Sequence, residues 1–209
     1  METELLRIFD EEKNPIGVAT RAEVHKNGFW HEVFQCWFVT FDEDEVYIFL
    51  QLRSMQKKDY PNLFDITSAG HLLADETVEH GVREIKEELG IDVEFDELIS
   101  LGVIEYSVKE NNFIDNEIAN VFLYITNKDV FDKFMLQEEE VAGIVKARLT
   151  DFVELWLGEK ETIPINGFIV TKQGSKNEIN EIVGRERFVP HEISFYLSVL
   201  QNIKEKLKK

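Results

Sequence analysis

A chain of 209 residues with 44% hydrophobic side chains can bury a real core, which excludes an intrinsically disordered protein. Its 41 acidic and 23 basic residues give a formal charge of −18, which argues against a long nucleic acid as a partner because like charges repel. The single cysteine, Cys36, excludes an intramolecular disulfide, and the sequence has neither a leader nor an apolar run of about 18 residues, so we expect a cytoplasmic protein without a membrane partner.

The strands are predicted from runs of β-branched and aromatic residues, and no repeat or composition break divides residues 1–209 into two domains. Residues 4–9 and 17–23 flank a turn-like segment and predict a hairpin, within an N-terminal extension of residues 1–29. A core of about residues 30–157 is expected to hold the other strands. These are residues 33–41, 46–53, 64–68, 99–108, 120–126 and 141–149.

The helices are predicted from apolar residues at helical spacing. A strong helix is expected over residues 77–89, ended by Gly90, and shorter helices over residues 130–135 and 150–157. The glycines of residues 158–189 lack phosphate-loop spacing, so this segment is predicted to be irregular. A terminal helix from Pro190 should pack on the core, or alternatively form the contact of a homodimer.

One face of the helix over residues 77–89 is apolar and the other is acidic. Glu84, Glu87 and Glu88 share the acidic face, where neighbouring like charges repel each other. A divalent cation would turn that repulsion into binding, and Mg²⁺ suits oxygen ligands that leave room for water and substrate phosphates. Arg83 lies four residues before Glu87 and can hold a carboxylate in place. A solvated acidic face without a metal is the simpler alternative.

The segment GHLLADETVEHGVREIKEELGI resembles the signature of the Nudix family. That signature is a Gly, five residues, a Glu, seven residues, then Arg-Glu-apolar-any-Glu-Glu-any-Gly-apolar. The matching residues here are Gly70, Glu76, Arg83, Glu84, Ile85, Glu87, Glu88, Gly90 and Ile91. One spacing departs, because six residues instead of seven separate Glu76 from Arg83, so the entry to the helix must be remodelled.

The resemblance implies an α+β fold, a Nudix-type α/β/α sandwich with a mixed sheet, to which this chain adds the N-terminal hairpin and the C-terminal helix. It further implies metal-dependent hydrolysis of a diphosphate linkage in a nucleoside diphosphate derivative or a similar small diphosphate. The implied metal is Mg²⁺ (or Mn²⁺), and the partner is the small-molecule diphosphate itself. The ligands of the metal would be Glu84, Glu87 and Glu88, which together with Arg83 form the predicted catalytic group.

Residues outside the helix supply the other predicted roles. The acidic run Glu138, Glu139 and Glu140 resembles a loop that provides a general base in some Nudix hydrolases, and Glu139 is the residue chosen for that role. Arg53 and Gly70 are predicted to contact the substrate. Each residue of the acidic run is equally compatible with an exposed loop.

A second resemblance is to the isopentenyl diphosphate isomerases within the Nudix family. The run LQLRSMQKKDYPNLFDITSAGH is similar to theirs, and His25, His31, His71 and Glu117, with Asp115, occupy places similar to the ligands of the isomerase metal. Each histidine alone is also compatible with an ordinary structural role.

The isomerase has a catalytic cysteine where this chain has Ala69, and a methyl group cannot transfer a proton. Cys36 does not replace that cysteine by position, since it lies in an alternating strand. Hydrolysis is therefore favoured. Isomerase-like proton transfer and a non-catalytic Nudix ligand sensor remain the alternatives.

Overall fold

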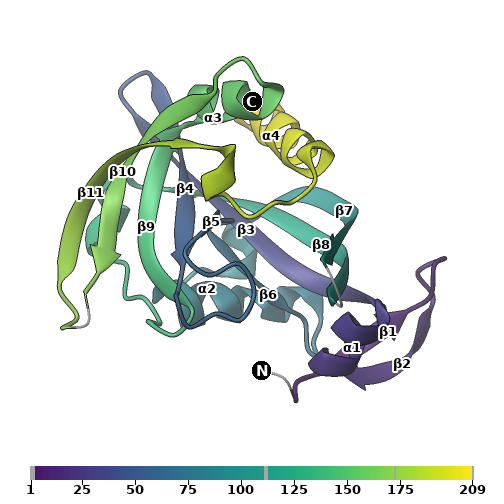
Figure 1. The fold of residues 1–209 in the computed structure, drawn as a ribbon. Coiled ribbons are helices and arrows are strands. Elements are labelled where there is room, and N and C mark those ends of the chain that lie inside the picture. The colour runs from purple at the N-terminus through teal and green to yellow at the C-terminus, as the bar shows by residue number, and fades with distance from the viewer. Residues whose placement is uncertain (1–2, 111–112, 172, 209) are drawn as a thin grey trace.

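The computed structural model describes residues 3–110, 113–171 and 173–208, and its strands join in one eleven-stranded mixed sheet (Figure 1). The main path runs β11-β10-β9-β4-β3-β1-β2, while β5 pairs with β4, β6 and β8 pair with β3, and β7 pairs with β8. The strands are β1 (Leu5–Phe9), β2 (Pro15–Thr20), β3 (Trp30–Asp42), β4 (Glu45–Arg53), β5 (Phe64–Asp65), β6 (Ser68–His71), β7 (Ile99–Glu110), β8 (Phe113–Thr126), β9 (Val141–Arg148), β10 (Thr162–Val170) and β11 (Lys176–Gly184).

The central strand β3 carries the core on both of its faces. Its side chains alternate between two apolar clusters, so that Trp37 and Val39 pack in one cluster and Cys36 and Phe38 in the other. Helix α2 (Val82–Leu89) covers the Cys36 face, and helices α3 (Leu149–Leu157) and α4 (Ile193–Leu207) cover the opposite face (Figure 1). This arrangement confirms the predicted α+β sandwich. Cys36 is buried, as its position in the sequence suggested.

The N-terminal hairpin of β1 and β2 is confirmed, but residues 21–23 do not continue its second strand. They begin helix α1 (Arg21–Asn27), because Thr20 and Glu23 form a reciprocal capping box and Gly28 ends the helix with φ of 69°. This local signal, a threonine followed three residues later by a glutamate, outweighs the strand-like composition around it.

The prediction of an irregular segment over residues 158–189 was wrong. β10 and β11 form a nine-pair antiparallel hairpin that extends the sheet beyond β9. Pro164 and Gly167 look like strand breakers, yet both lie within β10. A Cβ on Gly167 would lie 2.1 Å from the carbonyl oxygen of Ile144, so the close approach of β9 requires glycine there.

Two predicted helices are shorter or tighter than expected. The first turn before α2 is the 3-10 helix η1 (Val78–Gly81), and the helix expected over residues 130–135 is the 3-10 helix η3 (Lys128–Asp132). Two more 3-10 turns, η2 (Phe95–Glu97) and η4 (Arg185–Arg187), lie in connections. α3 begins one residue earlier than predicted and ends where expected.

Helix α4 packs on the core of its own chain, which confirms the first of the two predictions for the terminal helix. Its apolar face is buried against the α3 side of the sheet, with Phe195, Val199 and Ile203 each at most 1% exposed. A homodimer stays a prediction. Within the described residues, no helix has the length and apolar character needed to cross a membrane.

Candidate functional site

Strand β6 separates two groups of titratable side chains, because its own side chains point alternately to its two faces. It pairs antiparallel with β3, which places Ala69 opposite Gln35 and His71 opposite Val33. Successive side chains of a strand point to opposite faces, so Ser68 and Gly70 face α2 while Ala69 and His71 face away from it. The acidic face of α2 and the histidines therefore lie on either side of one short strand.

On the α2 side, two glutamates are enclosed. Glu88 is 6% exposed and accepts hydrogen bonds from Ser68 Oγ at 2.7 Å and from the amide of Ala69 at 3.1 Å. Burial, with the nearby charge of Glu84, raises the pKa of Glu88 to about 8. Burial also raises the pKa of Glu84 to about 7, against the lowering effect of Arg83. Glu87 has a side chain that is 55% exposed.

Arg83 joins the remaining residues of the motif. Its Nε lies 2.5 Å from Glu76 Oε1, and its guanidinium also donates to Glu84 at 2.7 Å, Glu87 at 3.3 Å and the carbonyl of His71 at 3.0 Å. Glu76 in turn accepts from the amide of Leu73 at 2.8 Å. The short spacing before Arg83 therefore leaves the Glu76–Arg83 pair intact, and the remodelled entry to the helix is the tight turn η1.

Gly70 is required by the position of Glu84. A Cβ built on Gly70 would lie 2.1 Å from Glu84 Cδ and within 2.5 Å of both carboxylate oxygens. Because Arg83 holds that carboxylate, a side chain at this position would push it away from its partner. The structure thus gives Gly70 a spatial role next to the acidic cluster.

On the other side of β6, three histidines from three elements converge. His25 comes from α1, His31 from β3 and His71 from β6, and their ring centroids are 5.0 to 5.3 Å apart. Their nearest nitrogens lie within 4.8 Å of one another. Burial lowers the pKa of His31 to about 4 and that of His71 well below its usual value, so both rings are neutral and can offer lone pairs.

Carboxylates from β8 complete this histidine cluster. Asp115 Oδ1 lies 3.3 Å from His25 Nε2 and 3.5 Å from His31 Nε2, and His31, Asp115 and Glu117 form a second close group. His31 Nε2, His71 Nε2 and Asp115 Oδ1 are buried without a hydrogen-bond partner. The two close groups share His31, and their unpartnered nitrogen and oxygen atoms fit a metal ion, because imidazole and carboxylate ligands suit a transition metal or Mg²⁺.

Glu117 is also tied to neighbours that the sequence did not suggest. It accepts a hydrogen bond from the hydroxyl of Tyr106 and another from Gln35 Nε2 at 3.2 Å. Burial, with the charge of Asp115, raises the pKa of Glu117 well above its usual value, and burial raises that of Tyr106 as well. Tyr106 lies on β7, a strand whose sequence gave no chemical signal.

The connection between β4 and β5 covers this region, and we call residues 54–62 the cavity loop. Lys57 of this loop is paired with Glu140, and Arg21 of α1 lies 4.0 Å from the carboxylate of Asp59. Arg53, at the end of β4, donates to the carbonyl of Asp59 at 2.9 and 3.2 Å. The predicted substrate contact Arg53 is therefore partly engaged with the protein itself.

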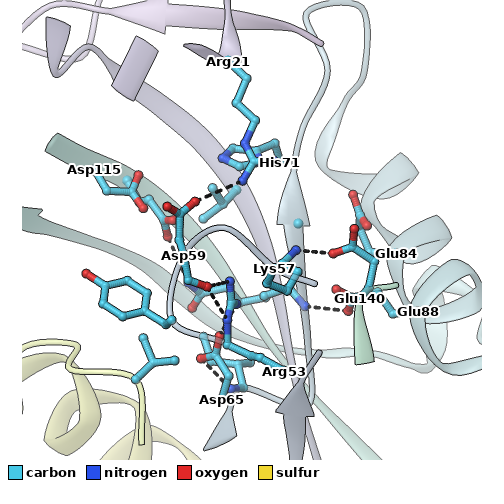
Figure 2. Close-up of a pocket in the computed structure, with 18 of the residues that line it drawn as sticks. Arg21, Arg53, Lys57, Asp59, Asp65, His71, Glu84, Glu88, Asp115 and Glu140 are labelled. Atoms are coloured by element: carbon cyan, nitrogen blue, oxygen red, sulfur yellow. Dashed lines mark hydrogen bonds and ion pairs between the residues drawn. The ribbon is translucent and has the colours of Figure 1, made fainter. Parts of the chain in front are cut away.

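Residues of both groups line one cavity of about 500 Å³, while His31 is buried behind its wall. Figure 2 shows Glu84 and Glu88 on one side, Asp115 and His71 on the other, and Lys57 with Arg53 between them. Glu140 lines this cavity, whereas Glu139 is exposed and is not among the lining residues, so the choice of Glu139 within the acidic run is not favoured by its position. His191, from the C-terminal segment, is a lining residue that the sequence reasoning missed.

Comparison with known proteins finds relatives of the same two kinds, Nudix hydrolases and isopentenyl-diphosphate isomerases. The family model of the NUDIX domain matches residues 16–166. An uncharacterised Nudix hydrolase of Clostridium acetobutylicum is 38% identical over 201 residues, which cover 96% of this chain and 97% of that protein. Isopentenyl-diphosphate Delta-isomerase 2 of Photorhabdus laumondii is 31% identical over 121 residues, or 57% of this chain and 66% of that protein.

Two solved structures share the fold at low identity. A MutT/nudix family protein from Enterococcus faecalis has a TM-score of 0.55 at 9% identity and covers 83% of this chain and 62% of that one. The Ap4A hydrolase of C. elegans, in a binary complex, has a TM-score of 0.51 at 13% identity and covers 85% of this chain and 97% of that one. These likenesses concern the arrangement of the elements alone.

Proposed function

The chain belongs to the Nudix hydrolase family, and from that premise we propose that it hydrolyses a diphosphate linkage with the help of Mg²⁺ or Mn²⁺. The substrate would be a nucleoside diphosphate derivative or a similar small diphosphate. The observation that carries the proposal is the convergence of Glu84, Glu87 and Glu88 from one helix onto a single cavity. Glu84 and Glu88 are enclosed, and ionising two enclosed neighbouring carboxylates costs free energy that a divalent cation offsets.

In this proposal the three glutamates hold the divalent metal, which supplies Lewis acidity and charge neutralisation at the diphosphate. Arg83 keeps Glu84 and Glu87 in register, since it contacts both carboxylates and is anchored by Glu76. Ser68 and the amide of Ala69 orient Glu88 in the same way. Preorganised ligands of this kind lower the cost of binding a cation.

The cations around the cavity are suited to the phosphate oxygens. Arg21, Arg53 and Lys57 line the cavity together with the acidic cluster. Lys57 and Arg21 are each engaged with a carboxylate, from Glu140 and Asp59 respectively. A diphosphate carries more negative charge than either carboxylate, so we expect both cations to turn toward the substrate when it binds.

Hydrolysis also needs a group that accepts the proton of the attacking water. We assign that role to Glu140 in place of the neighbouring Glu139, because only Glu140 of this pair lines the cavity. Displacement of Lys57 toward the substrate would leave the Glu140 carboxylate free to accept a proton.

The histidine cluster favours a second candidate, isomerase-like proton transfer on an isoprenoid diphosphate. His25, His71 and Glu117 of the cluster line the same cavity, and Glu117 is hydrogen-bonded to Tyr106. Several isopentenyl-diphosphate Delta-isomerases are among the relatives. Ala69 argues against it, since its methyl faces the cavity where a proton-transferring group would be needed. We therefore place this reading second.

One experiment separates these readings. Purified protein is incubated with nucleotide sugars, dinucleotides, oxidised nucleotides and isopentenyl diphosphate, each with and without Mg²⁺ or Mn²⁺, and the products are separated and identified. Metal-dependent cleavage of a diphosphate linkage into two phosphate-containing products, lost in Glu87→Gln, supports hydrolysis. The matched control Glu79→Gln, an exposed glutamate just before α2, should keep full activity.

Two other outcomes would overturn the proposal. An isomerised product in which the diphosphate is intact would establish the isomerase-like reaction. Tight binding of one compound without any turnover would indicate a ligand sensor.

A further inference from the structure

The C-terminal segment lies beyond the part of the chain matched by the NUDIX domain, yet it reaches the cavity. The matched region ends at residue 166, whereas Val189 and His191 both line the cavity next to the catalytic motif. Two hydrogen bonds of the Val189 backbone fix this approach: its amide donates to the carbonyl of Phe64 at 2.9 Å, and its carbonyl accepts from the Tyr196 hydroxyl at 2.8 Å. The segment is therefore built into the wall of the cavity.

The side chain of His191 contacts a buried carboxylate on β5. Its Nε2 lies 3.0 Å from Asp65 Oδ1, and Asp65 is 4% exposed. Burial alone would raise the pKa of Asp65, but the hydrogen bond and charge of His191, with Arg53, hold it below the usual range. The carboxylate is therefore ionised and only accepts, so His191 Nε2 is the donor.

The other oxygen of Asp65 connects this contact to the cavity loop. Asp65 Oδ2 accepts from Arg53 at 2.8 Å, and the same guanidinium holds the carbonyl of Asp59 at 2.9 and 3.2 Å. Asp59 lies two residues after Lys57, which is paired with Glu140. A continuous path of hydrogen bonds thus runs from the C-terminal segment through one carboxylate to the loop that covers the cavity.

We propose that His191 and Asp65 are positioning residues for the diphosphate site, acting through Arg53 on the cavity loop. They do not touch the substrate. They fix the direction of the Arg53 guanidinium, and that guanidinium in turn fixes the backbone that carries Lys57. The C-terminal segment is then a working part of the site, because His191, from beyond residues 16–166, holds a carboxylate that lies within them.

The first test needs no substrate. Limited trypsin digestion of the native protein is followed by mass spectrometry, and cleavage after Lys57 and Lys58 in the cavity loop is compared with cleavage after Lys133, on an exposed turn outside the cavity. Loop cleavage reports the population of the open loop.

We expect His191→Leu to speed cleavage of the loop about threefold and Asp65→Asn about tenfold, because a hydrogen bond to a charged group is lost. His191→Gln keeps a donor near the position of Nε2 and should stay within about twofold of wild type. Asp151→Asn is the matched control, since Asp151 is a buried carboxylate paired with Lys160 away from the cavity. Unchanged loop cleavage in both His191→Leu and Asp65→Asn would overturn the proposal.

The second test rests on the proposed function and uses the diphosphate compound that the panel identifies. His191→Leu should raise KM about tenfold while kcat changes less than about twofold, and His191→Gln should restore KM. A purely structural role would lower the unfolding temperature and leave KM unchanged. If no compound is hydrolysed, the proposed function fails, but the trypsin result still tests the role of His191. If Asp65→Asn does not fold, the comparison of His191→Leu with His191→Gln tests that role alone.

Discussion

The two polar groups of the cavity are assembled in opposite ways. The acidic cluster comes from one short stretch of α2, in which Glu84, Glu87 and Glu88 share one face because of helical spacing. The histidine cluster draws His25, His31, His71 and the carboxylates of β8 from four separate elements. One group is set by a single helix, and the other exists only when the whole sheet has formed.

The two groups should respond differently to substitutions and to the absence of a metal. The α2 carboxylates are joined by Arg83, so a substitution there affects neighbours on the same helix. The histidine cluster has buried nitrogens and an Asp115 oxygen without partners, which is costly without a bound ion. We therefore expect the acidic cluster to control turnover and the histidine cluster to control a separate metal-binding equilibrium.

The largest expected effect tests whether hydrolysis depends on one group or on both. Glu87→Gln and Glu88→Gln should each lower kcat by about 10²-fold or more, because each removes a carboxylate proposed to hold the metal. His31→Gln should lower kcat far less. Steady-state kinetics on the identified compound, with circular dichroism to verify folding, makes the comparison. Equal losses in all three variants would show that the two groups work as one centre.

The next effect concerns metal affinity. Titration calorimetry with Mn²⁺ should reveal two classes of site in the wild-type protein. His31→Gln should weaken one class by about 100-fold or more, since it removes a buried ligand, and should leave the other class unchanged. Glu87→Gln should do the reverse. A single class of site in the wild-type protein, lost equally in both variants, would contradict two independent centres.

A smaller effect is expected at the strand between the two groups. Gly70→Ala places a methyl 2.1 Å from the Glu84 carboxyl carbon, and the side chain must swing away from Arg83. We expect kcat to fall about tenfold, with a loss in unfolding free energy of only about 1 kcal/mol. Mn²⁺ binding at the histidine cluster should be unaffected. Activity equal to wild type would show that Glu84 has no fixed position in catalysis.

The sequence allowed the acidic cluster to be predicted because helical periodicity is local. The strands of the core were likewise visible as apolar runs, and α4 as a periodic stripe. The β10–β11 hairpin was missed because Pro164 and Gly167 are read as breakers, whereas the close approach of β9 is the reason for Gly167. Such a reason exists only between strands that are distant in the sequence.

The residues of the site also divide into those that the sequence indicated and those that it did not. His25, His31 and His71 were found through resemblance alone, because no spacing rule relates residues on a helix and two strands. Asp65 lies in the run that resembles the isomerases, but neither Tyr106 nor His191 had a sequence signal, since their chemistry comes from burial beside residues distant in the sequence. Glu139 was chosen over Glu140 because a run of three glutamates does not indicate which side chain faces inward.

The smallest predicted effect is on stability, and it compares the two groups by pH. Glu84 and Glu88, with pKa values raised by burial to about 7 and about 8, hold protons in the folded protein that an unfolded glutamate loses near pH 4.3. Their contribution is fully present below that value and is lost as pH rises through about 7 and 8. His31 and His71 have lowered pKa values, so their opposing effect ends at about pH 6.5, where the unfolded imidazole loses its proton.

In the metal-free protein, the free energy of unfolding should therefore fall between about pH 6.5 and 8, by up to about 1.4 kcal/mol per pH unit for each glutamate. Urea unfolding at several pH values measures this slope. Glu88→Gln should reduce the slope, because glutamine does not titrate and only Glu84 remains, and saturating Mg²⁺ should flatten it by binding the ionised carboxylates. A slope that is undiminished in both Glu84→Gln and Glu88→Gln would show that it does not come from the acidic cluster. The cost of ionising that cluster, on which the need for a metal at α2 is argued, would then lose its support.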